Sequence, residues 1–368
     1  MSLPADSPAR EAALALLLEE AGFAGAIRRP LAGDASTRRY ERLYRGDRTA
    51  ILMDAPPNNE SPPCPAGASF EERYRLGWNA LSRLAASRIE AFVAVAGYLR
   101  GLGLSAPEIY AFDLAAGFAV VEDLGESLFA KVVSQGGDEV ALYAAAGEAL
   151  AVAQAQAPPL QLAGQGVAWP LLEYDGLALA ANADLFVEWL PQFVPEVRIS
   201  EDRLSRWSQV RDALITEALA FPRAFTIRDY HAENLIWMPE RAGAAQVGLL
   251  DFQDAVLGWA GWDFMMLLQD ARRDVSKPAQ AAAIRAYLER TGGSEAALTE
   301  EIAVLGCLNA LRLLGLFSRL VARDGKPRYA SFMPKVWRTL RESLAFPAMA
   351  EMAAFVGETA GSALEADA

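Results

Sequence analysis

Three side chains with oxygen ligands are spaced in a way that could support chemistry. Asp229 and Asn234 are five residues apart in FTIRDYHAENLIWMPE, residues 225–240, and Asp251 ends the later apolar run VGLLD. If LIWM and VGLLD pair as a hairpin, Asn234 and Asp251 meet at its open end and Asp229 lies in the loop just before it. Two carboxylates and an amide form a ligand set that suits Mg²⁺.

Phosphoryl transfer needs such a set, with one acid to accept a hydroxyl proton and an acid and an amide to hold the metal. The alternative is that Asp229 caps a turn and Asn234 bonds its own backbone. Each residue taken alone favours that alternative, whereas the three together favour the chemical interpretation.

His231 is the only histidine in the chain, and the two cysteines, Cys64 and Cys307, are far apart in the sequence. A zinc deaminase needs two close cysteines, and a zinc protease of the H-E-x-x-H type needs a second histidine. A serine hydrolase needs a G-x-S-x-G elbow, which the sequence lacks. We therefore expect His231 to orient or pack the loop, and two ordinary thiols predict a reducing, cytoplasmic location.

The bulk composition describes an ordinary globular protein of 368 residues, with 53% hydrophobic and 22% charged residues. The net charge of -13 would repel nucleic acid and anionic membranes, so an anionic substrate would need a local basic cluster. We expect no export signal at the start of the chain. The apolar run 302–317 is interrupted by Arg312 and is shorter than a membrane span, so it predicts a buried helix.

Changes of periodicity along the chain predict a small sheet-rich lobe followed by a mostly helical lobe. A helix over 9–22 precedes alternating segments between 30 and 57, and 56–68 is a Pro-rich surface loop of unassigned role. One helical segment over 69–101 and two short strands, EIYAFDL and GFAVVEDLG, complete the first lobe. We place the lobes at 1–125 and 126–368, with LIWM and VGLLD as a lone strand pair among the helices of the second.

Seven segments in order, from Leu31 to Val275, resemble the aminoglycoside phosphotransferase-like family of kinase-fold enzymes. They are LAGDASTRRYERL, ILMDAPP, GLSAPEIYAFD, VVEDLGE, RDYHAENLIW, LLDFQDAVLGWAGWD and LLQDARRDV. Within that family the sequence is most similar to the bacterial cell-wall sugar kinases, which act at the anomeric carbon of N-acetylmuramate and N-acetylglucosamine. The resemblance implies a bilobal α+β fold, with a small antiparallel-sheet lobe and a mostly helical lobe. It also implies ATP and Mg²⁺ as cofactors, a sugar as substrate, and a part in peptidoglycan recycling.

The resemblance also implies roles for single residues. Asp229 would be the catalytic base, Asn234 and Asp251 would hold Mg²⁺, and Asp263 would support the catalytic loop. Residues Glu122 to Gly125, Leu124 included, would form the hinge that offers backbone hydrogen bonds to adenine. A loop over the ATP phosphates would contain Gly33, Asp34, Ala35, Ser36, Thr37, Arg38 and Arg39.

One departure from the family concerns the phosphate-binding lysine, because Met53 occupies its expected position. Either Arg38 or Arg39 replaces that cation, or nucleotide binding differs. A nucleotide-binding scaffold without catalysis therefore stays open, although the Asp229, Asn234 and Asp251 set argues against it. Glu90 is a weak match for the helix acid that would partner such a lysine.

The charges in the sequence give the only information about the identity of the phosphoryl acceptor. Polycationic aminoglycosides would suit the acidic surface, whereas muramate carries a carboxylate and would need arginine, for which Arg272 and Arg273 are the candidates. Their alternative roles are a solvated helix end or ion pairs with Asp270 or Asp274.

Other residues near the predicted metal motif could also contact the substrate. His231 and Glu233 lie beside Asn234 and are further candidates, and Trp189, Trp259 and Trp262 could stack on a sugar or pack in the core. Another small alcohol or an aminoglycoside stays open as the acceptor, as does the oligomeric state.

Overall fold

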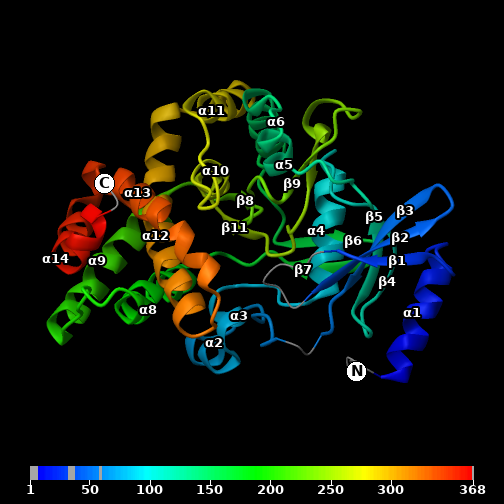
Figure 1. Cartoon of the computed structure of the whole chain (residues 1–368), viewed down its shortest axis with the longest axis horizontal. Coiled ribbons are helices and arrows are strands. Elements are labelled where there is room, and N and C mark those ends of the chain that lie inside the picture. The colour runs from blue at the N-terminus through cyan, green and yellow to red at the C-terminus, as the bar shows by residue number, and fades with distance from the viewer. Residues whose placement is uncertain (1–6, 32–37, 58–59, 367–368) are drawn as a thin grey trace.

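A computed structural model describes residues 7–31, 38–57 and 60–366. Its first lobe is a five-stranded antiparallel sheet in the order β1-β2-β3-β5-β4, with α1 on one face and α4 on the other (Figure 1). Gly46, with a φ of 58°, allows the two-residue turn between β2 and β3. The elements are α1 (Pro8–Glu20), β1 (Ile27–Pro30), β2 (Arg39–Arg45), β3 (Arg48–Asp54), α4 (Ile89–Gly101), β4 (Ile109–Asp113) and β5 (Phe118–Glu122).

The two faces of this sheet belong to two hydrophobic cores. Leu52 on β3 packs toward α1, whereas its neighbour Met53 points to the α4 side and joins the main core that continues into the second lobe. The alternation of side chains along a strand produces this division. The predicted small antiparallel sheet is therefore confirmed.

The segment 69–101, predicted as one helical region, is broken into three helices. They are α2 (Phe70–Leu76), α3 (Trp78–Leu81) and α4. Gly77, Arg83 and Ala86 have φ values of 97°, 58° and 54°, and left-handed backbone cannot continue a helix. The prediction of a single segment was wrong because two of these residues are not glycine and carry no turn signal.

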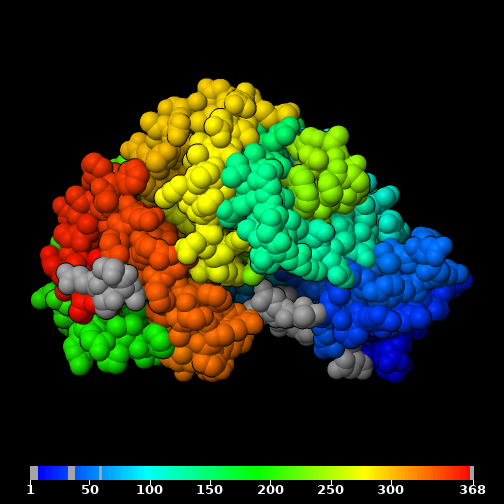
Figure 2. All heavy atoms as spheres, turned by 45° about the horizontal axis from the view of Figure 1, so that its top comes forward, coloured from blue at the N-terminus to red at the C-terminus, as the bar shows by residue number. Residues whose placement is uncertain are grey.

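The second lobe is mostly helical, as predicted. Its helices are α5 (Phe129–Ser134), α6 (Glu139–Ala153), α7 (Gly176–Ala183), α8 (Leu185–Phe193), α9 (Glu201–Ala220), α10 (Ala260–Leu268), α11 (Lys277–Thr291), α12 (Glu295–Ala322), α13 (Met333–Leu344) and α14 (Ala350–Ala366). Figure 2 shows a hollow on the surface between the first lobe, in blue, and the orange segment that includes the end of α12.

The second lobe contains three short strand pairs, so the prediction of a lone pair was wrong. They are β6 (Gln161–Gly164) with β7 (Val167–Pro170), β8 (Ala224–Thr226) with β11 (Val256–Gly258), and β9 (Leu235–Trp237) with β10 (Val247–Leu249). Strands of three or four residues are too short to show alternation in a sequence.

Helix α4 of the first lobe is tied to the second lobe at two places. A Cβ atom at Gly97 would lie 2.5 Å from the Gly164 Cα atom, so α4 and β6 approach backbone to backbone. Just after α4, the Leu249 amide on β10 donates to the Ser105 carbonyl at 2.9 Å. Both contacts use backbone atoms, so side-chain motion cannot release them.

Helix α12 contains the apolar run 302–317 and lies at the centre of the helical lobe (Figure 1). Its 28 residues are long and apolar enough to cross a membrane, but 67% of the most apolar window is buried inside the fold. The run predicted a buried helix, and this is confirmed, although the helix extends well beyond the run.

Candidate active site

The loop between β8 and β9 carries Asp229 and is held from behind by α10. Asp263, fully buried in the first turn of α10, accepts hydrogen bonds from the amides of Ile227 at 2.9 Å and Arg228 at 2.8 Å. The Trp262 indole donates to the Arg228 carbonyl at 3.1 Å. These bonds fix Arg228 in left-handed backbone, with a φ of 83°, and thereby set the direction in which Asp229 leaves the strand. Asp263 thus supports the loop as predicted.

Asn234 and Asp251 meet at one end of the β9–β10 hairpin, as the sequence predicted. The strands pair antiparallel with Leu235 opposite Leu249, and the Leu250 amide donates to the Asn234 carbonyl at 2.9 Å. The Asn234 Nδ2 atom donates to the Asp229 carbonyl at 2.9 Å, so its Oδ1 atom is the one left for a cation. The hairpin and the loop are therefore locked together at Asn234.

Burial and neighbouring charge control the protonation of Asp229. Its pKa is raised, first by burial and then by the Asp251 carboxylate, while the guanidinium groups of Arg228, Arg312 and Arg272 act in the opposite direction. A carboxyl group that is closely surrounded by protein and next to a second carboxylate holds its proton more strongly than one in water. Asp229 is therefore a stronger base than an ordinary aspartate, which is what proton abstraction at neutral pH requires.

Asp251 and the beginning of β2 come together across the lobes. The Asp251 Oδ1 atom accepts from Gln253 Nε2 at 2.8 Å and lies 3.2 Å from an Arg38 guanidinium nitrogen. Arg39, the other candidate, begins β2, and the remaining residues of the predicted phosphate loop, Gly33, Asp34, Ala35, Ser36 and Thr37, lie outside the described residues. The structure thus brings Arg38, one of the two candidate replacement cations, to the predicted metal ligand.

The expected lysine position offers no cation of its own. Met53 is 1% exposed and lies opposite Tyr40 on one side and Ala119 on the other. Glu90, the weak candidate for the lysine's acidic partner, forms an ion pair with its near neighbour Arg88 instead. Met53 and Glu90 therefore do not form the ion pair that a phosphate-binding lysine and its acidic partner would form at these positions.

His231 supports Asn234 from inside the fold. It is 6% exposed, and its Nε2 atom lies 3.3 Å from Asn234 Nδ2. Burial lowers the pKa of its imidazole, with Arg272 adding to the effect, so the ring is neutral at physiological pH. This geometry agrees with a residue that orients the loop, and its possible contact with substrate stays a prediction.

The arginines predicted to grip the substrate are engaged with acids. Arg272 Nε lies 2.9 Å from Glu233 Oε2, and another of its nitrogens is 3.5 Å from Asp270 Oδ1. Arg273 is 4.0 Å from Glu139 Oε1. The ion pair with Asp270, considered as the alternative, is present, and a substrate role for Arg272, Arg273 and Glu233 stays a prediction.

The predicted hinge packs against the hairpin that carries Asn234. The Glu122 carboxylate accepts from Arg241 at 2.5 Å, and Leu124 joins Ile236 and Met238 in a small buried apolar cluster. An apolar surface of this kind, where the chain passes from the first lobe to the second, suits a flat aromatic base. The backbone hydrogen bonds expected of Glu122 and Leu124 stay a prediction.

Two groups near Asp229 were not predicted from the sequence as part of the site. Asp254 is partly buried, its Oδ1 atom accepts from the Ala85 amide at 2.6 Å, and burial raises its pKa. Arg312 projects from α12, where the sequence shows it only as an interruption of an apolar run. A lone charge in such a run was the available signal, because a buried charge is costly unless it has a task. Trp259 and Trp262 are buried, as packing predicts.

Comparisons with known proteins agree on the kind of molecule. A model of the phosphotransferase enzyme family matches residues 27–305. The chain is 50% identical to an N-acetylmuramate/N-acetylglucosamine kinase of Caulobacter vibrioides, over 95% of this chain and 96% of the relative. It is 31% identical to a protein of the same name from Pseudomonas aeruginosa, over 88% of this chain and 86% of the relative.

Solved structures with the same fold are more distant in sequence. A choline/ethanolamine kinase family protein from Mesorhizobium loti superposes with a TM-score of 0.56 at 19% identity, covering 95% of this chain and 97% of that one. An ADP-bound aminoglycoside phosphotransferase gives a TM-score of 0.54 at 12% identity, covering 92% and 100%. These two likenesses establish a kinase-like fold and no more.

Proposed function

The chain belongs to the phosphotransferase enzyme family, and from this premise we propose that it transfers the γ-phosphoryl group of ATP to the anomeric hydroxyl of N-acetylmuramate and of N-acetylglucosamine. The product is a sugar 1-phosphate, and the proposed setting is peptidoglycan recycling in the cytoplasm. The two cysteines, both free and buried, suit a reducing compartment. The observation that carries the proposal is the meeting of Asp229, Asn234 and Asp251 in a chain so similar to sugar kinases.

Asp229 acts as the base in this proposal. Its carboxylate accepts the proton of the anomeric hydroxyl as that oxygen attacks phosphorus. The raised pKa of Asp229 improves it as an acceptor, and an anomeric hydroxyl is more acidic than an ordinary alcohol, so the two pKa values lie closer together. The bonds from the Ile227 and Arg228 amides to Asp263 keep the loop rigid while the proton moves.

The chemistry of the donors suits Mg²⁺ at the end of the hairpin. Asp251 offers a carboxylate and Asn234 an amide oxygen, and Mg²⁺ binds few protein carboxylates because it shares its sites with substrate phosphates. Within the described residues no group of three histidine, cysteine or acidic side chains forms a metal site, which agrees with such a sparse set. When bound, the metal would neutralise charge on the phosphates.

Arg38 is the proposed substitute for the lysine absent at Met53. Its guanidinium lies 3.2 Å from Asp251, so it already stands where the phosphates and the metal ligand come together. A guanidinium there can bind two phosphate oxygens, which a methionine cannot.

The missing lysine also favours a second candidate, a nucleotide-binding scaffold without catalysis. A kinase for another small alcohol or for an aminoglycoside is the remaining alternative. Incubation with ATP, Mg²⁺ and a panel of hydroxyl acceptors separates the three, with products identified by phosphorus and proton NMR. We expect an acid-labile 1-phosphate from both amino sugars and none from the methyl glycoside of N-acetylglucosamine, whose anomeric oxygen is blocked.

Two results would contradict the proposal. Transfer to the methyl glycoside would place the reaction at another hydroxyl, and transfer to none of the acceptors would favour the scaffold. The Asp229→Asn variant is the matched control, because it keeps the shape of the side chain and removes the base.

A further inference from the structure

Arg312 is a crowded cation without an acidic contact. Its Nε atom donates to Asn182 Oδ1 at 3.1 Å, and its Nη1 atom donates to Asn309 Oδ1 at 2.9 Å. Both partners are neutral amides. Within the described part of the chain, no carboxylate oxygen lies within 4.0 Å of this guanidinium and no hydrogen bond uses its Nη2 atom.

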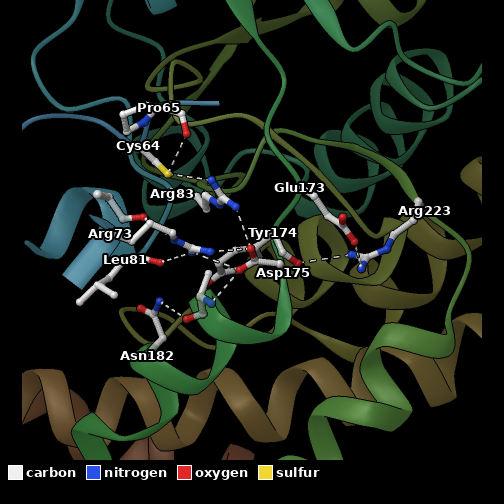
Figure 3. Close-up of polar contacts among 12 residues, drawn as sticks. Cys64, Pro65, Arg73, Leu81, Arg83, Glu173, Tyr174, Asp175, Asn182 and Arg223 are labelled. Atoms are coloured by element: carbon white, nitrogen blue, oxygen red, sulfur yellow. Dashed lines mark hydrogen bonds and ion pairs between the residues drawn. The ribbon is translucent and has the colours of Figure 1, made fainter. Parts of the chain in front are cut away.

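Two other arginines with little exposed surface are neutralised by contact with an acid. Arg73 and Arg83 both reach Asp175, at 2.6 and 2.8 Å (Figure 3). Taking a charge out of water costs several kcal/mol unless a partner of opposite sign is supplied. Arg312 is held by amides in a conformation that gives its charge no contact with an acid, so an anion from outside the chain could supply that contact.

Arg312 is partly exposed and is not sealed in the core. Burial lowers its pKa, and the charges of Arg228 and Arg272 act in the same direction, against those of Tyr174 and Asp229. Its guanidinium is therefore closely surrounded by protein and still in contact with solvent. The unused Nη2 nitrogen is the donor available to an incoming anion.

Hydrogen bonds connect Arg312 to the loop of the proposed base. Asn182, which accepts from Arg312, donates to Ser82. The carbonyl of the next residue, Arg83, accepts from Arg228, which directly precedes Asp229. In agreement with this, the charges of Arg312 and Asp229 each influence the pKa of the other. Arg228 and Arg272 also act on Asp229, which makes a basic cluster in a chain of net charge -13. An anionic substrate requires such a cluster.

The chain around α3, at Trp78 and Ser82, lies close to Arg312. Asn182 on α7, which accepts from Arg312, also donates to Ser82 Oγ at 3.1 Å. About two turns further along the same face of α12, the Arg319 guanidinium lies 5.4 Å from the centre of the Trp78 ring on α3. The chain around α3 therefore covers the same side of α12 from which Arg312 projects.

Of the three arginines near Asp229, Arg312 is the one available to a ligand. Arg272 pairs with Glu233 and Asp270. Arg228 donates to the Arg83 carbonyl at 3.1 Å and stacks over Tyr174. Helix α12 packs among the helices of the second lobe, away from the Leu124 cluster at the hinge, so its ligand belongs to the acceptor rather than to adenine.

We propose that Arg312 binds the lactyl carboxylate of N-acetylmuramate and is the residue that lets the enzyme use this anionic sugar as well as neutral N-acetylglucosamine. The inference rests on the proposed function, because the two acceptors differ only by the lactyl ether. Asn182 and Asn309 orient the guanidinium, and its Nη2 face meets the carboxylate. Arg312 thus determines specificity and takes no part in moving the proton.

The test measures kcat/KM for both sugars with wild type, Arg312→Gln and Arg312→Lys. Loss of a charge-assisted hydrogen bond predicts a fall of about 10- to 100-fold for N-acetylmuramate with Arg312→Gln, a smaller fall with Arg312→Lys, and a change within about threefold for N-acetylglucosamine. KM for ATP should not change. Arg323→Gln, which makes the same charge change at the exposed end of α12, should leave both sugars unaffected.

A substrate-side arm keeps the test valid even if a variant fails to fold. The methyl ester of N-acetylmuramate has the same shape without the charge, so wild type should prefer the acid over the ester by a similar factor. Arg312→Gln should show no such preference.

Three outcomes would overturn the inference. Equal losses for both sugars would mean that Arg312 acts on the transferred phosphoryl group or on the loop. No selective loss in the variant, or no preference of wild type for the acid, would remove its role in specificity. If wild type phosphorylates neither sugar, the proposed function itself fails, and this result is distinct from the other two.

Discussion

Two groups of aspartate and arginine in this molecule use the same residue types in opposite ways. At Asp175 the charges touch, because Arg73 and Arg83 both bond its carboxylate. Burial raises the pKa of Asp175, but these hydrogen bonds outweigh it, so the net pKa is lowered. At Asp229 burial and the Asp251 carboxylate raise the pKa, and the arginines, which act only from a distance, do not outweigh them.

The difference shows how spacing decides what a charge can do. A carboxylate that accepts hydrogen bonds from two guanidinium groups stays ionised and holds segments of the chain together. Here Asp175, at the start of α7, is bonded to Arg73 of α2 and to Arg83, which follows α3 (Figure 3). A carboxylate with cations nearby but none in contact keeps its lone pairs for a proton. The first arrangement stabilises the fold, and the second is available for catalysis.

The strongest test of this contrast removes the distant type of carboxylate. Asp229→Asn should lower kcat by about 10³-fold, because general base catalysis contributes that much. The free energy of unfolding should not fall, since the change removes a buried charge next to Asp251. Steady-state kinetics and thermal unfolding of the same sample measure both. A variant that keeps most of its activity would contradict the assignment of the base.

The contact type of carboxylate should give the opposite result. Asp175→Asn keeps the cap on the Ala178 amide but leaves Arg73 and Arg83 without their anion. We expect a loss of about 2–4 kcal/mol in the free energy of unfolding, with kcat of the folded protein changed only a few-fold.

Urea unfolding at several pH values gives the sign of this effect. The folded pKa of Asp175 is lowered, so the stabilisation is present at neutral pH and is lost as the pH falls through that pKa. The difference between wild type and Asp175→Asn should therefore shrink in acid. A difference that grows in acid would show that another group is responsible.

Glu301 sharpens the comparison because it is a buried carboxyl with no charged partner in the described structure. It accepts from the Gly261 amide at 2.7 Å, and burial raises its pKa to about 7. Between about pH 4 and 7 the folded protein keeps a proton that the unfolded chain has released, so wild-type stability falls as the pH rises.

Glu301→Gln removes this dependence and keeps the acceptor for Gly261. The variant should equal wild type near pH 4 and exceed it by about 3 kcal/mol at pH 8, as measured by chemical unfolding at both pH values. Equal stability at pH 8 would mean that the carboxylate is better solvated than its burial indicates.

The smallest expected effect is on the pH at which activity is lost in acid. Because burial and Asp251 raise the pKa of Asp229, the acid limb of the kcat/KM profile should lie above the value of an unperturbed aspartate, about 4. A profile of kcat/KM against pH with N-acetylglucosamine, which has no carboxylate of its own, isolates the enzyme group. A limb at or below pH 4 would rule out Asp229 as a perturbed base.

The sequence predicted the parts of the site that lie close together along the chain. Asp229, Asn234 and Asp251 are joined by one loop and one hairpin, and their spacing together with the apolar runs was enough to bring them to one point. The sheet of the first lobe was predicted for the same reason, since alternation and short turns are local signals.

What the sequence did not predict depends on contacts between distant residues. Asp175 and Arg73 are 102 residues apart in the sequence, and Arg312 belongs to a helix that is separated from the Asp229 loop by two other α-helices. The break in segment 69–101 follows from left-handed backbone at Arg83 and Ala86, which tertiary packing imposes on residues that do not favour it. Short strands such as β8 and β11 form only because they pair with each other, although they are far apart in the sequence.

The backbone contacts of α4 bear on how the enzyme is controlled. In protein kinases the position of the corresponding helix switches the enzyme on and off. Here the close approach of Gly97 to Gly164 and the bond from Leu249 to Ser105 fasten α4 to the lobe that carries Asp229. Movement of α4 away from that lobe would break these backbone contacts, so a switch of the protein-kinase kind would cost this enzyme part of its tertiary structure.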